Sequence, residues 1–339
     1  MPEIHLPQKI IFERNAIEHF SFKRVERTIL ICDSEIIKNR GALERLENKC
    51  RKFSAQVRTV FNTNVHELYN LASEEFFLDE AELIVAVGSS AAIDCGMLLT
   101  SESGADFTAI PCCCASTMTD FENGEYFSYR HSPTTLVLDP MLIEQIPSSA
   151  VAYDAFAAFA YAVDTLSSTD NIITRSLAIH GAVGIYKSII PACRGEIASL
   201  DKLMYSMYFA VAAHRNAKEI GNSYLSRVGR FFADYGYSKN SVCAVILPNI
   251  MEYEESATRR GIFEIATAVG LAQEDDDPSF ATVKLIDEIR RIQAKLGIPR
   301  AISGFNLAEN AYRTRRIHSN IPDDLLDLCY YGSFKFMKL

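Results

Sequence analysis

Hydrophobic and polar positions follow two different rhythms along this chain. Up to Pro147, short apolar runs of the kind that form buried parallel strands alternate with stretches of helical periodicity. The predicted strands cover residues 27–33, 56–61, 81–87, 107–111 and 134–140, and the predicted helices cover 43–50, 66–77 and a stretch that begins near residue 92. Strands separated by helices of this length predict βαβ units and a mainly parallel sheet.

After Pro147 the helical rhythm continues and strand-like alternation almost disappears. The predicted helical segments are 151–168, 171–190, 202–220, 224–234, 240–254, 256–271 and 278–295. We therefore predict an α/β domain over residues 1–147 and an all-helical domain over residues 148–339. A length of 339 residues agrees with two domains.

Composition and charge narrow the classes of partner. Hydrophobic residues make up 48% and charged residues 23% of the chain, which is typical of a globular protein. Because a protein that binds nucleic acid normally carries a basic surface, the net charge of −9 predicts no nucleic-acid partner. The sequence shows neither an apolar run of membrane-spanning length nor a signal peptide, so we expect no membrane partner and a cytoplasmic protein.

The nine cysteines also favour a reducing compartment, because their number is odd and their spacing fits no disulfide framework. Three of them are consecutive, Cys112, Cys113 and Cys114. Adjacent side chains point in different directions, so this run cannot provide the paired thiolates of a C-x-x-C zinc site. We interpret these cysteines as packing or loop residues.

One predicted strand runs directly into a loop of small residues, Gly88-Ser89-Ser90-Ala91, after which a helix begins that contains Asp94. Small residues leave backbone N–H groups accessible, and a helix N-terminus attracts anions, so this is a candidate phosphate-binding loop. Small residues also suit any tight turn from a strand to a helix, and that interpretation stays open.

Several further motifs occur in a fixed order along the chain. They are Cys32-Asp33, the loop Gly88-Ser89-Ser90-Ala91, Ala109-Ile110-Pro111, Leu138-Asp139-Pro140, Leu247-Pro248 and Leu296-Gly297-Ile298-Pro299. In this order, over roughly residues 7–315, the sequence resembles the iron-containing alcohol dehydrogenase family. The superfamily also contains glycerol dehydrogenases, glycerol-1-phosphate dehydrogenases and dehydroquinate synthases.

The resemblance implies a dehydroquinate synthase-like fold, in which a nucleotide-binding domain and a helical domain enclose a cleft for cofactor and small-molecule substrate. It implies NAD or NADP as the cofactor and a homo-oligomeric assembly. The residues that it implies in cofactor binding lie in two loops: Gly88, Ser89, Ser90 and Ala91 with Asp94 at the pyrophosphate, and Cys112, Cys113, Ser116 and Thr117 beside the nicotinamide.

The sequence departs from the family pattern at the cofactor loop. The family loop typically has three glycines and a serine, whereas here only Gly88 remains. Each added Cβ restricts the backbone and obstructs the close approach of a phosphate. Family members often carry a lysine one turn after the Asp of this motif, where this chain has Met97. Both differences weaken the prediction of dinucleotide binding without excluding it.

The departure at the metal site is larger. The family ligands are an aspartate and three histidines, which suit divalent iron or zinc acting as a Lewis acid. If Asp154 takes the aspartate position, Ala158 stands at the first histidine position, Lys239 at the last, and residues 225–227 cover the other. None of the seven histidines matches a ligand position, so we predict that the chain holds no metal at this site.

The same substitutions suggest catalytic candidates. Lys239 would place a fixed cation where the family has its metal, and the Tyr161 hydroxyl could donate a proton to a developing alkoxide. Alternatively, Lys239 is a solvated lysine before a helix, and Asp154 is a residue that begins a helix.

Three functions follow from these observations. The first is an NAD(P)-dependent oxidoreductase that acts on a small alcohol or carbonyl without the family metal. The second is a catalytically remodelled or inactive relative that binds a ligand or partner. A lyase or synthase related to dehydroquinate synthase is the third, but those enzymes also need the metal and the nucleotide, so the same losses count against it.

Overall fold

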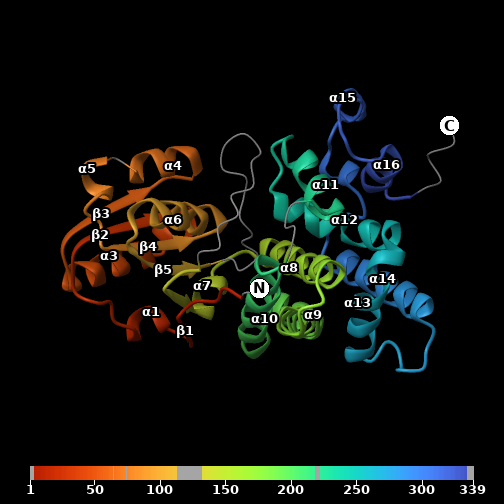
Figure 1. Ribbon diagram of the computed structural model, residues 1–339, viewed down its shortest axis with the longest axis horizontal. Coiled ribbons are helices and arrows are strands. Elements are labelled where there is room, and N and C mark those ends of the chain that lie inside the picture. The colour runs from red at the N-terminus through yellow and green to blue at the C-terminus, as the bar shows by residue number, and fades with distance from the viewer. Residues whose placement is uncertain (1–3, 64, 74, 113–131, 218–221, 334–339) are drawn as a thin grey trace. The chain divides into compact units, whose positions relative to one another are not determined.

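The computed structural model describes residues 4–63, 65–73, 75–112, 132–217 and 222–333 (Figure 1). The chain divides into two compact units, Met1–Pro147 and Ser148–Leu339. The first unit is an α/β sheet structure, and the second consists of helices, without a strand among the residues described. The fold class predicted from the sequence is therefore confirmed.

The first unit contains a six-stranded sheet in which every pair of neighbouring strands is parallel. The strands are β1 (Lys9–Phe12), β2 (Val25–Cys32), β3 (Ser54–Phe61), β4 (Leu83–Gly88), β5 (Asp106–Pro111) and β6 (Thr135–Leu138). The five strands predicted from hydrophobic runs are present, and β1 is an additional edge strand whose side chains are mostly exposed. The exposure of β1 explains why no buried apolar run marks it in the sequence.

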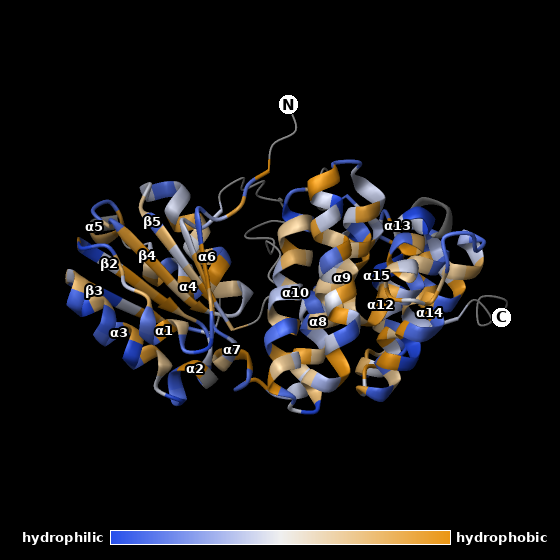
Figure 2. Cartoon of the chain, turned by 90° about the horizontal axis from the view of Figure 1, so that it is seen from below, coloured by the Kyte–Doolittle hydropathy of each residue, from blue (hydrophilic) through white to orange (hydrophobic). Residues whose placement is uncertain are grey.

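Helices cover both faces of this sheet because its central strands are hydrophobic on both sides (Figures 1 and 2). The helices are α1 (Ala16–His19), α2 (Glu35–Asn39), α3 (Ala42–Phe53), α4 (Val65–Ala72), α5 (Glu75–Leu78), α6 (Ser90–Ser103) and α7 (Pro140–Ile143). On α3, the apolar side chains Leu43, Leu46 and Cys50 are spaced one helical turn apart and are buried in the core.

The strand order β1-β6-β5-β4-β2-β3 determines where a ligand can bind. From β2 the chain moves outward to β3, then returns to β4 on the other side of β2 and continues to β5. The carboxyl ends of β2 and β4 therefore lie side by side at the point where the direction of winding reverses. Open α/β sheets bind ligands in the crevice at such a point. Asp33 follows β2 there, and Ser89 follows β4.

The second unit is built from long helices joined by short connections. They are α8 (Ser148–Ser168), α9 (Ile172–Cys193), α10 (Ile197–Arg215), α11 (Tyr224–Ala233), α12 (Lys239–Tyr253), α13 (Glu255–Ala268), α14 (Pro278–Lys295), the 3₁₀ turn η1 (Ile302–Phe305), α15 (Glu309–Arg316) and α16 (Asp323–Tyr331). Each helical segment predicted here from periodicity is present, although α8 and α10 begin earlier than predicted. Within the described residues, none of the helices is both long and apolar enough to cross a membrane.

Two glycines of α9 explain how closely this helix packs against α10. A Cβ atom on Gly181 would lie 2.5 Å from the backbone nitrogen of Ala210, and one on Gly184 would lie 2.0 Å from Oγ of Ser206. Any larger side chain would force the helices apart, so the glycines set the spacing of this pair.

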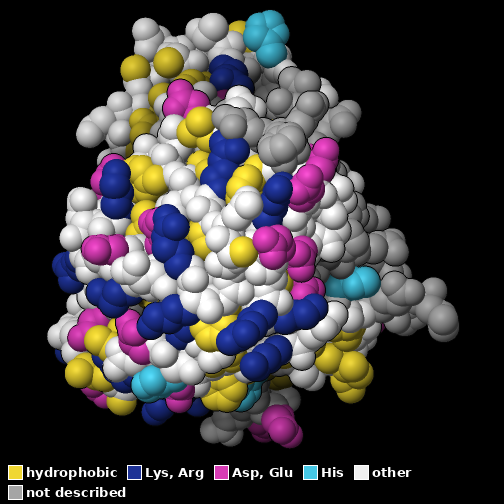
Figure 3. All heavy atoms as spheres, turned by 90° about the vertical axis from the view of Figure 1, so that its left-hand side faces the viewer, with side chains coloured by type: hydrophobic (Ala, Val, Ile, Leu, Met, Phe, Trp, Pro, Cys, Tyr) yellow, Lys and Arg dark blue, Asp and Glu magenta, His cyan; other side chains and the backbone are white. Residues whose placement is uncertain are grey.

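The surface that faces the viewer in Figure 3 carries charges of both signs, with Lys and Arg side chains interspersed among Asp and Glu. Exposed ion pairs occur in the first unit, such as that between Arg51 and Glu47 on α3 (2.6 Å). Exposed pairs of this kind contribute only about 0.3–0.5 kcal/mol each. They therefore contribute little to the stability of the fold.

Candidate functional site

The small-residue loop after β4 is hydrogen-bonded to a carboxylate from the neighbouring strand. The backbone N–H of Ser89 donates to Oδ1 of Asp33 (2.8 Å), and that of Ala92 donates to Oδ2 (3.1 Å). The Ser89 hydroxyl also donates to Oδ2 of Asp33. Burial raises the pKa of Asp33, whereas these three hydrogen bonds lower it. Asp33 thus occupies N–H groups at the start of α6 that an anionic ligand would otherwise use.

Asp33 also accounts for the one glycine that the loop retains. Gly88 has a φ of +145°, and a Cβ atom there would lie 2.0 Å from Oδ1 of Asp33. Only glycine avoids this contact. The close approach of a side chain from β2 therefore explains Gly88 without a phosphate, and the sequence analysis did not anticipate this.

The other predicted cofactor residues have different environments. Ser90 and Ala91 are half-buried at the start of α6, where a ligand can reach them. Asp94 and Cys112 are 6% and 3% exposed, and Cys112 packs in the hydrophobic core. Cys113, Ser116 and Thr117 lie outside the described residues. The prediction that these side chains bind a cofactor stays a prediction.

In the helical unit, the structure brings two of the three catalytic candidates together. The Tyr161 hydroxyl donates to Oδ1 of Asn240 (2.9 Å), and Nδ2 of Asn240 donates to Oδ1 of Asp154 (3.4 Å). Asn240 thus links Tyr161 and Asp154, which both lie on α8. The interpretation of Asp154 as a residue that begins a helix is wrong, because α8 begins at Ser148 and Asp154 lies well inside it.

Lys239, the third candidate, is the first residue of α12 and is half-buried. A Cβ atom on Gly229 would lie 3.6 Å and 3.8 Å from Cγ and Cε of Lys239, so the methylene groups of the lysine run over Gly229 on α11. The interpretation of Lys239 as a solvated loop residue is therefore wrong. Its side chain packs between two helices of the unit.

Next to these candidates lies a buried group that the sequence analysis did not single out. Oδ2 of Asp164 accepts a hydrogen bond from the Ser223 hydroxyl (3.0 Å) and lies 3.6 Å from Nδ1 of His214. The His214 ring stacks on Tyr161, with 4.8 Å between the ring centroids. We call Asp154, Tyr161, Asp164, His214, Ser223, Lys239 and Asn240 the polar cluster. An aspartate within the apolar run of α8 was the available sequence signal.

Burial shifts both ionisable partners in this group toward their neutral forms. It raises the pKa of Asp164 to about 7; the hydrogen bond from Ser223 and the charge of Lys239 oppose that rise, while Glu254 adds to it. Burial, together with the charge of Lys239, lowers the pKa of His214 to about 3. His214 is therefore neutral at physiological pH, whereas Asp164 is present in both its protonated and its ionised form.

The hydrogen-bond network indicates which nitrogen of His214 carries the proton. Nδ1 of His214 lies 3.5 Å from Oγ1 of Thr165, and the Thr165 hydroxyl donates its own proton to the carbonyl oxygen of Tyr161 (2.7 Å). Oγ1 of Thr165 is thus an acceptor toward His214. This assignment places the proton on Nδ1, where it also faces Asp164.

The donor set at the position of the family metal does not fit a divalent ion. Ala158 and Leu225, at 0% and 2% exposure, bring only buried hydrocarbon, and Lys239 brings a positive charge. Among the residues that the structure describes, no three His, Cys, Asp or Glu side chains come together as metal ligands. Carboxylates and imidazoles are what iron and zinc require. The prediction of a chain without this metal stays a prediction.

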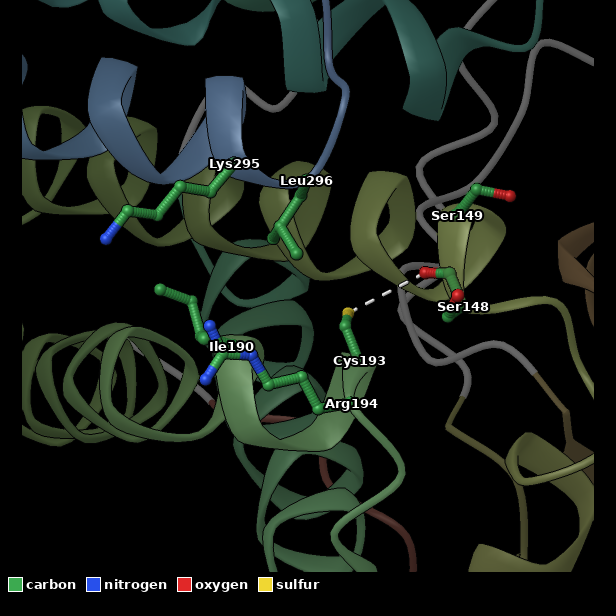
Figure 4. A pocket seen from close by; sticks show the side chains of 7 residues that line it. All are labelled: Ser148, Ser149, Ile190, Cys193, Arg194, Lys295 and Leu296. Atoms are coloured by element: carbon green, nitrogen blue, oxygen red, sulfur yellow. Dashed lines mark hydrogen bonds between the residues drawn. The ribbon is translucent and has the colours of Figure 1, made fainter.

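A separate cavity of about 260 Å³ opens in the helical unit and contains none of the predicted site residues (Figure 4). It is lined by Ser148, Ser149, Ile190, Cys193, Arg194, Lys295 and Leu296. The Cys193 thiol donates to the Ser148 carbonyl oxygen (3.6 Å), and burial raises its pKa to about 11. The thiol therefore stays protonated and is a poor nucleophile.

Comparisons with known proteins relate the chain to alcohol dehydrogenases. No protein-family model matches the sequence. A curated relative, long-chain-alcohol dehydrogenase 1 of Geobacillus thermodenitrificans (strain NG80-2), is 26% identical over 218 residues, which cover 62% of this chain and 53% of the relative. The matched region thus spans about half the length of that protein.

The solved structures match over nearly the whole chain. An alcohol dehydrogenase from Oenococcus oeni has a TM-score of 0.79 at 17% identity and covers 99% of this chain and 98% of its own. The iron-containing alcohol dehydrogenase from Thermococcus thioreducens has a TM-score of 0.76 at 18% identity, with coverage of 93% and 90%. A 1,3-propanediol oxidoreductase has a TM-score of 0.76 at 20% identity, with coverage of 94% and 92%. The chain has the fold of the iron-containing alcohol dehydrogenases.

Proposed function

We propose that this protein is an NAD(P)-dependent oxidoreductase that acts on a small alcohol or carbonyl compound. The observation that supports this most is the fold, which matches solved alcohol dehydrogenases over 93–99% of the chain. The relative from Geobacillus thermodenitrificans is an alcohol dehydrogenase by name as well. Fold alone does not establish a reaction, so the residues of the polar cluster have to supply the chemistry.

The cofactor would bind at the crevice between the carboxyl ends of β2 and β4. Ser90 and Ala91 are half-buried at the start of a 14-residue helix, whose N-terminus would attract the pyrophosphate. The backbone N–H of Ala91 already donates to Oγ of Ser89 (3.3 Å). The crevice fits a dinucleotide only in part, because Asp33 already takes the N–H groups of Ser89 and Ala92. When bound, the nicotinamide supplies or accepts the hydride.

In this proposal Lys239 is the catalytic residue. Its ammonium stabilises negative charge on the substrate oxygen and exchanges one proton with that oxygen, in the place where the family has its metal. Tyr161 is fully buried and donates its proton to Asn240, so it acts as a positioning residue. Asp154 holds the other end of Asn240, which directly follows Lys239 in α12.

Thermal unfolding in the presence of NAD⁺, NADH, NADP⁺ and NADPH tests the cofactor. A dinucleotide at 100 times its dissociation constant stabilises the protein by about 2.7 kcal/mol. The variant Ser90→Glu places a carboxylate at the first position of α6, which suits the helix but repels a phosphate. We expect it to abolish the shift, whereas Ser101→Glu, with the same charge change at the exposed other end of α6, keeps it. The proposal fails if none of the four dinucleotides changes the unfolding temperature.

A second candidate function is a remodelled relative that binds a ligand or partner without hydride transfer. The contacts of Asp33 favour it, because an internal carboxylate satisfies the loop and explains Gly88 without any nucleotide. The absence of a shift with any of the four dinucleotides would favour this alternative, whereas hydride transfer to or from a bound dinucleotide would exclude it.

A further inference from the structure

We propose that the cavity in the helical unit is a binding site for a small phosphate monoester, held between Arg194 after α9 and Lys295 at the end of α14 (Figure 4). The cavity includes no residue of the polar cluster and none of the crevice between β2 and β4. The inference therefore goes beyond the proposed function and does not depend on it.

Three helix ends form the walls of this cavity. Arg194 directly follows Cys193, the last residue of α9, while Lys295 is the last residue of α14. The third wall begins with Ser148, the first residue of α8. The hydrogen bond from the Cys193 thiol to the carbonyl oxygen of Ser148 (3.6 Å) connects the end of α9 to the start of α8. The two cations thus stand on different helices of one unit.

The backbone that carries each cation is closed by hydrogen bonds. The N–H of Arg194 donates to the carbonyl oxygen of Pro191 (3.1 Å), and the N–H of Leu296 donates to that of Ile292 (3.1 Å). Both helix ends are therefore formed before any ligand arrives. A ligand has to fix only the two long side chains, which limits the entropy that is lost on binding.

The two cations are also without partners of their own. Other arginines of this unit form ion pairs: Arg175, Arg260, Arg290, Arg291, Arg313, Arg315 and Arg316. Within the described part of the chain, neither the Arg194 guanidinium nor the Lys295 ammonium has a hydrogen-bond or ion-pair partner. Lys295 contributes to the lowered pKa of Glu288, but that carboxylate is already paired with Arg291. An anion between the two cations would remove their mutual repulsion.

Charge and size together favour a phosphate monoester as this anion. Such a group carries nearly two negative charges at neutral pH and so matches two cations. A guanidinium can bind two phosphate oxygens at once, and the ammonium adds a point charge. Ile190 and Leu296 supply apolar surface for a short carbon chain. The volume of about 260 Å³ lies below the roughly 300–1,000 Å³ of typical ligand pockets, so a dinucleotide does not fit.

Cations near helix C-termini also stabilise the helix dipole, which is a purely structural explanation for Arg194 and Lys295. It accounts for each cation separately, but not for their meeting at one cavity. In Figure 4 the two side chains extend from opposite walls toward the same side, and Ile190 lies between them in this view. The two explanations differ in whether an anion binds.

Isothermal titration calorimetry of the full chain with propyl phosphate, inorganic phosphate and 1-propanol tests the site, in Tris buffer at constant ionic strength. We expect propyl phosphate to bind with a dissociation constant below about 1 mM. Inorganic phosphate should bind several-fold more weakly, because it leaves Ile190 and Leu296 uncovered. 1-Propanol, which has the same carbon chain without the charge, should not bind.

Matched variants locate the bound phosphate. Arg194→Met and Lys295→Met each remove one charge while keeping a long side chain, and each should weaken binding of propyl phosphate at least about tenfold. Lys202→Met makes the same change of charge at an exposed position of α10 and should leave binding within about twofold, because remote charges are screened. Ile190→Glu supplies a carboxylate to both cations and should abolish binding, whereas Ile190→Gln should retain it.

The inference is overturned if propyl phosphate does not bind, since the two cations then serve only the helix ends. It is also overturned if Lys202→Met weakens binding as much as Arg194→Met, because binding then follows net charge. Loss of binding in Ser90→Glu, with Arg194→Met unaffected, would place the phosphate at α6 and overturn it as well.

The same measurements separate this inference from the proposed function. A dinucleotide-induced shift in unfolding temperature without binding of propyl phosphate refutes this inference alone. Binding of propyl phosphate that Arg194→Met weakens, without any dinucleotide-induced shift, refutes the proposed function alone.

Discussion

The opposite pKa shifts of Asp164 and His214 make a specific prediction about stability and pH. The pKa of Asp164 rises from 3.8 to about 7 on folding, so the folded state holds its proton more tightly. Its contribution to the free energy of unfolding is therefore greatest at low pH and is lost as the pH rises from about 4 to 7. The pKa of His214 falls from 6.5 to about 3, so its contribution is greatest at high pH and is lost as the pH falls from about 6.5 to 3.

The magnitudes follow from the same shifts. Each group changes the free energy of unfolding by up to about 1.4 kcal/mol per pH unit within its window. For Asp164, a shift of roughly three units corresponds to a total on the order of 4 kcal/mol, and His214 gives a similar total of opposite sign. Between about pH 4 and 6.5 the two slopes nearly cancel in the wild-type protein. Both side chains are almost fully buried, so solvent screening does not reduce these slopes much.

Replacing Asp164 or His214 should reveal how the remaining residue makes the free energy of unfolding depend on pH. In Asp164→Asn, the stability difference from the wild-type protein should shrink by about 1 kcal/mol or more per pH unit from pH 4 to 7, as the wild-type protein loses the contribution of Asp164. In His214→Gln, the difference should grow as the pH rises from 3 to 6.5. Urea unfolding followed by far-UV circular dichroism, which reports mainly on helices, measures both. Stability differences that do not vary with pH would refute the assignment of these two groups.

Three further predictions concern other contacts. Gly88→Ala should destabilise the first unit by several kcal/mol, because its Cβ would lie 2.0 Å from Oδ1 of Asp33. Asp33→Gly in the same chain should recover part of the lost stability. Equal losses in the single and double variants would contradict this steric explanation. Arg175→Met should lower the free energy of unfolding, measured in urea, by about 3 kcal/mol. Arg175 is 7% exposed, pairs with Glu264 (2.6 Å) and donates to the carbonyl oxygen of Leu166 (2.8 Å). Arg260→Met, which removes an exposed partner of the same Glu264, should lower it by less than about 0.5 kcal/mol. Lys239→Met should lower kcat about 10²- to 10³-fold with little change in KM for the dinucleotide, and a variant with wild-type kcat would remove Lys239 from the mechanism.

The sheet could be predicted from the sequence because buried parallel strands appear as uninterrupted apolar runs. β4, with every residue buried, is the clearest example. β1 could not be predicted in this way, since its exposed side chains leave no such run. The start of α8 was misplaced because the helix begins with Ser148 and Ser149, ahead of the apolar stretch that marks its interior.

The site was harder to predict, because its contacts join helices that are distant in sequence. Gly88 was interpreted as a remnant of a phosphate loop, whereas its neighbour is Asp33, 55 positions earlier in the chain. Asp164 and His214 meet only because α8 packs against α10. A periodic pattern identifies the buried face of each helix, but not which polar residues on two buried faces meet. The methylene groups of Lys239 likewise pack over Gly229, which has no side chain and gives no sequence signal of its own.

We propose that the ammonium of Lys239, and not a divalent ion, provides the positive charge that acts on the substrate oxygen. Elemental analysis of the purified protein after equilibration with Fe²⁺ or Zn²⁺ and removal of excess metal tests it most directly, with Asp154→Asn as the comparison. We expect much less than one equivalent of metal in both proteins and no change in unfolding temperature on adding a chelator. One equivalent of iron or zinc in the wild-type protein that is lost in Asp154→Asn would contradict it.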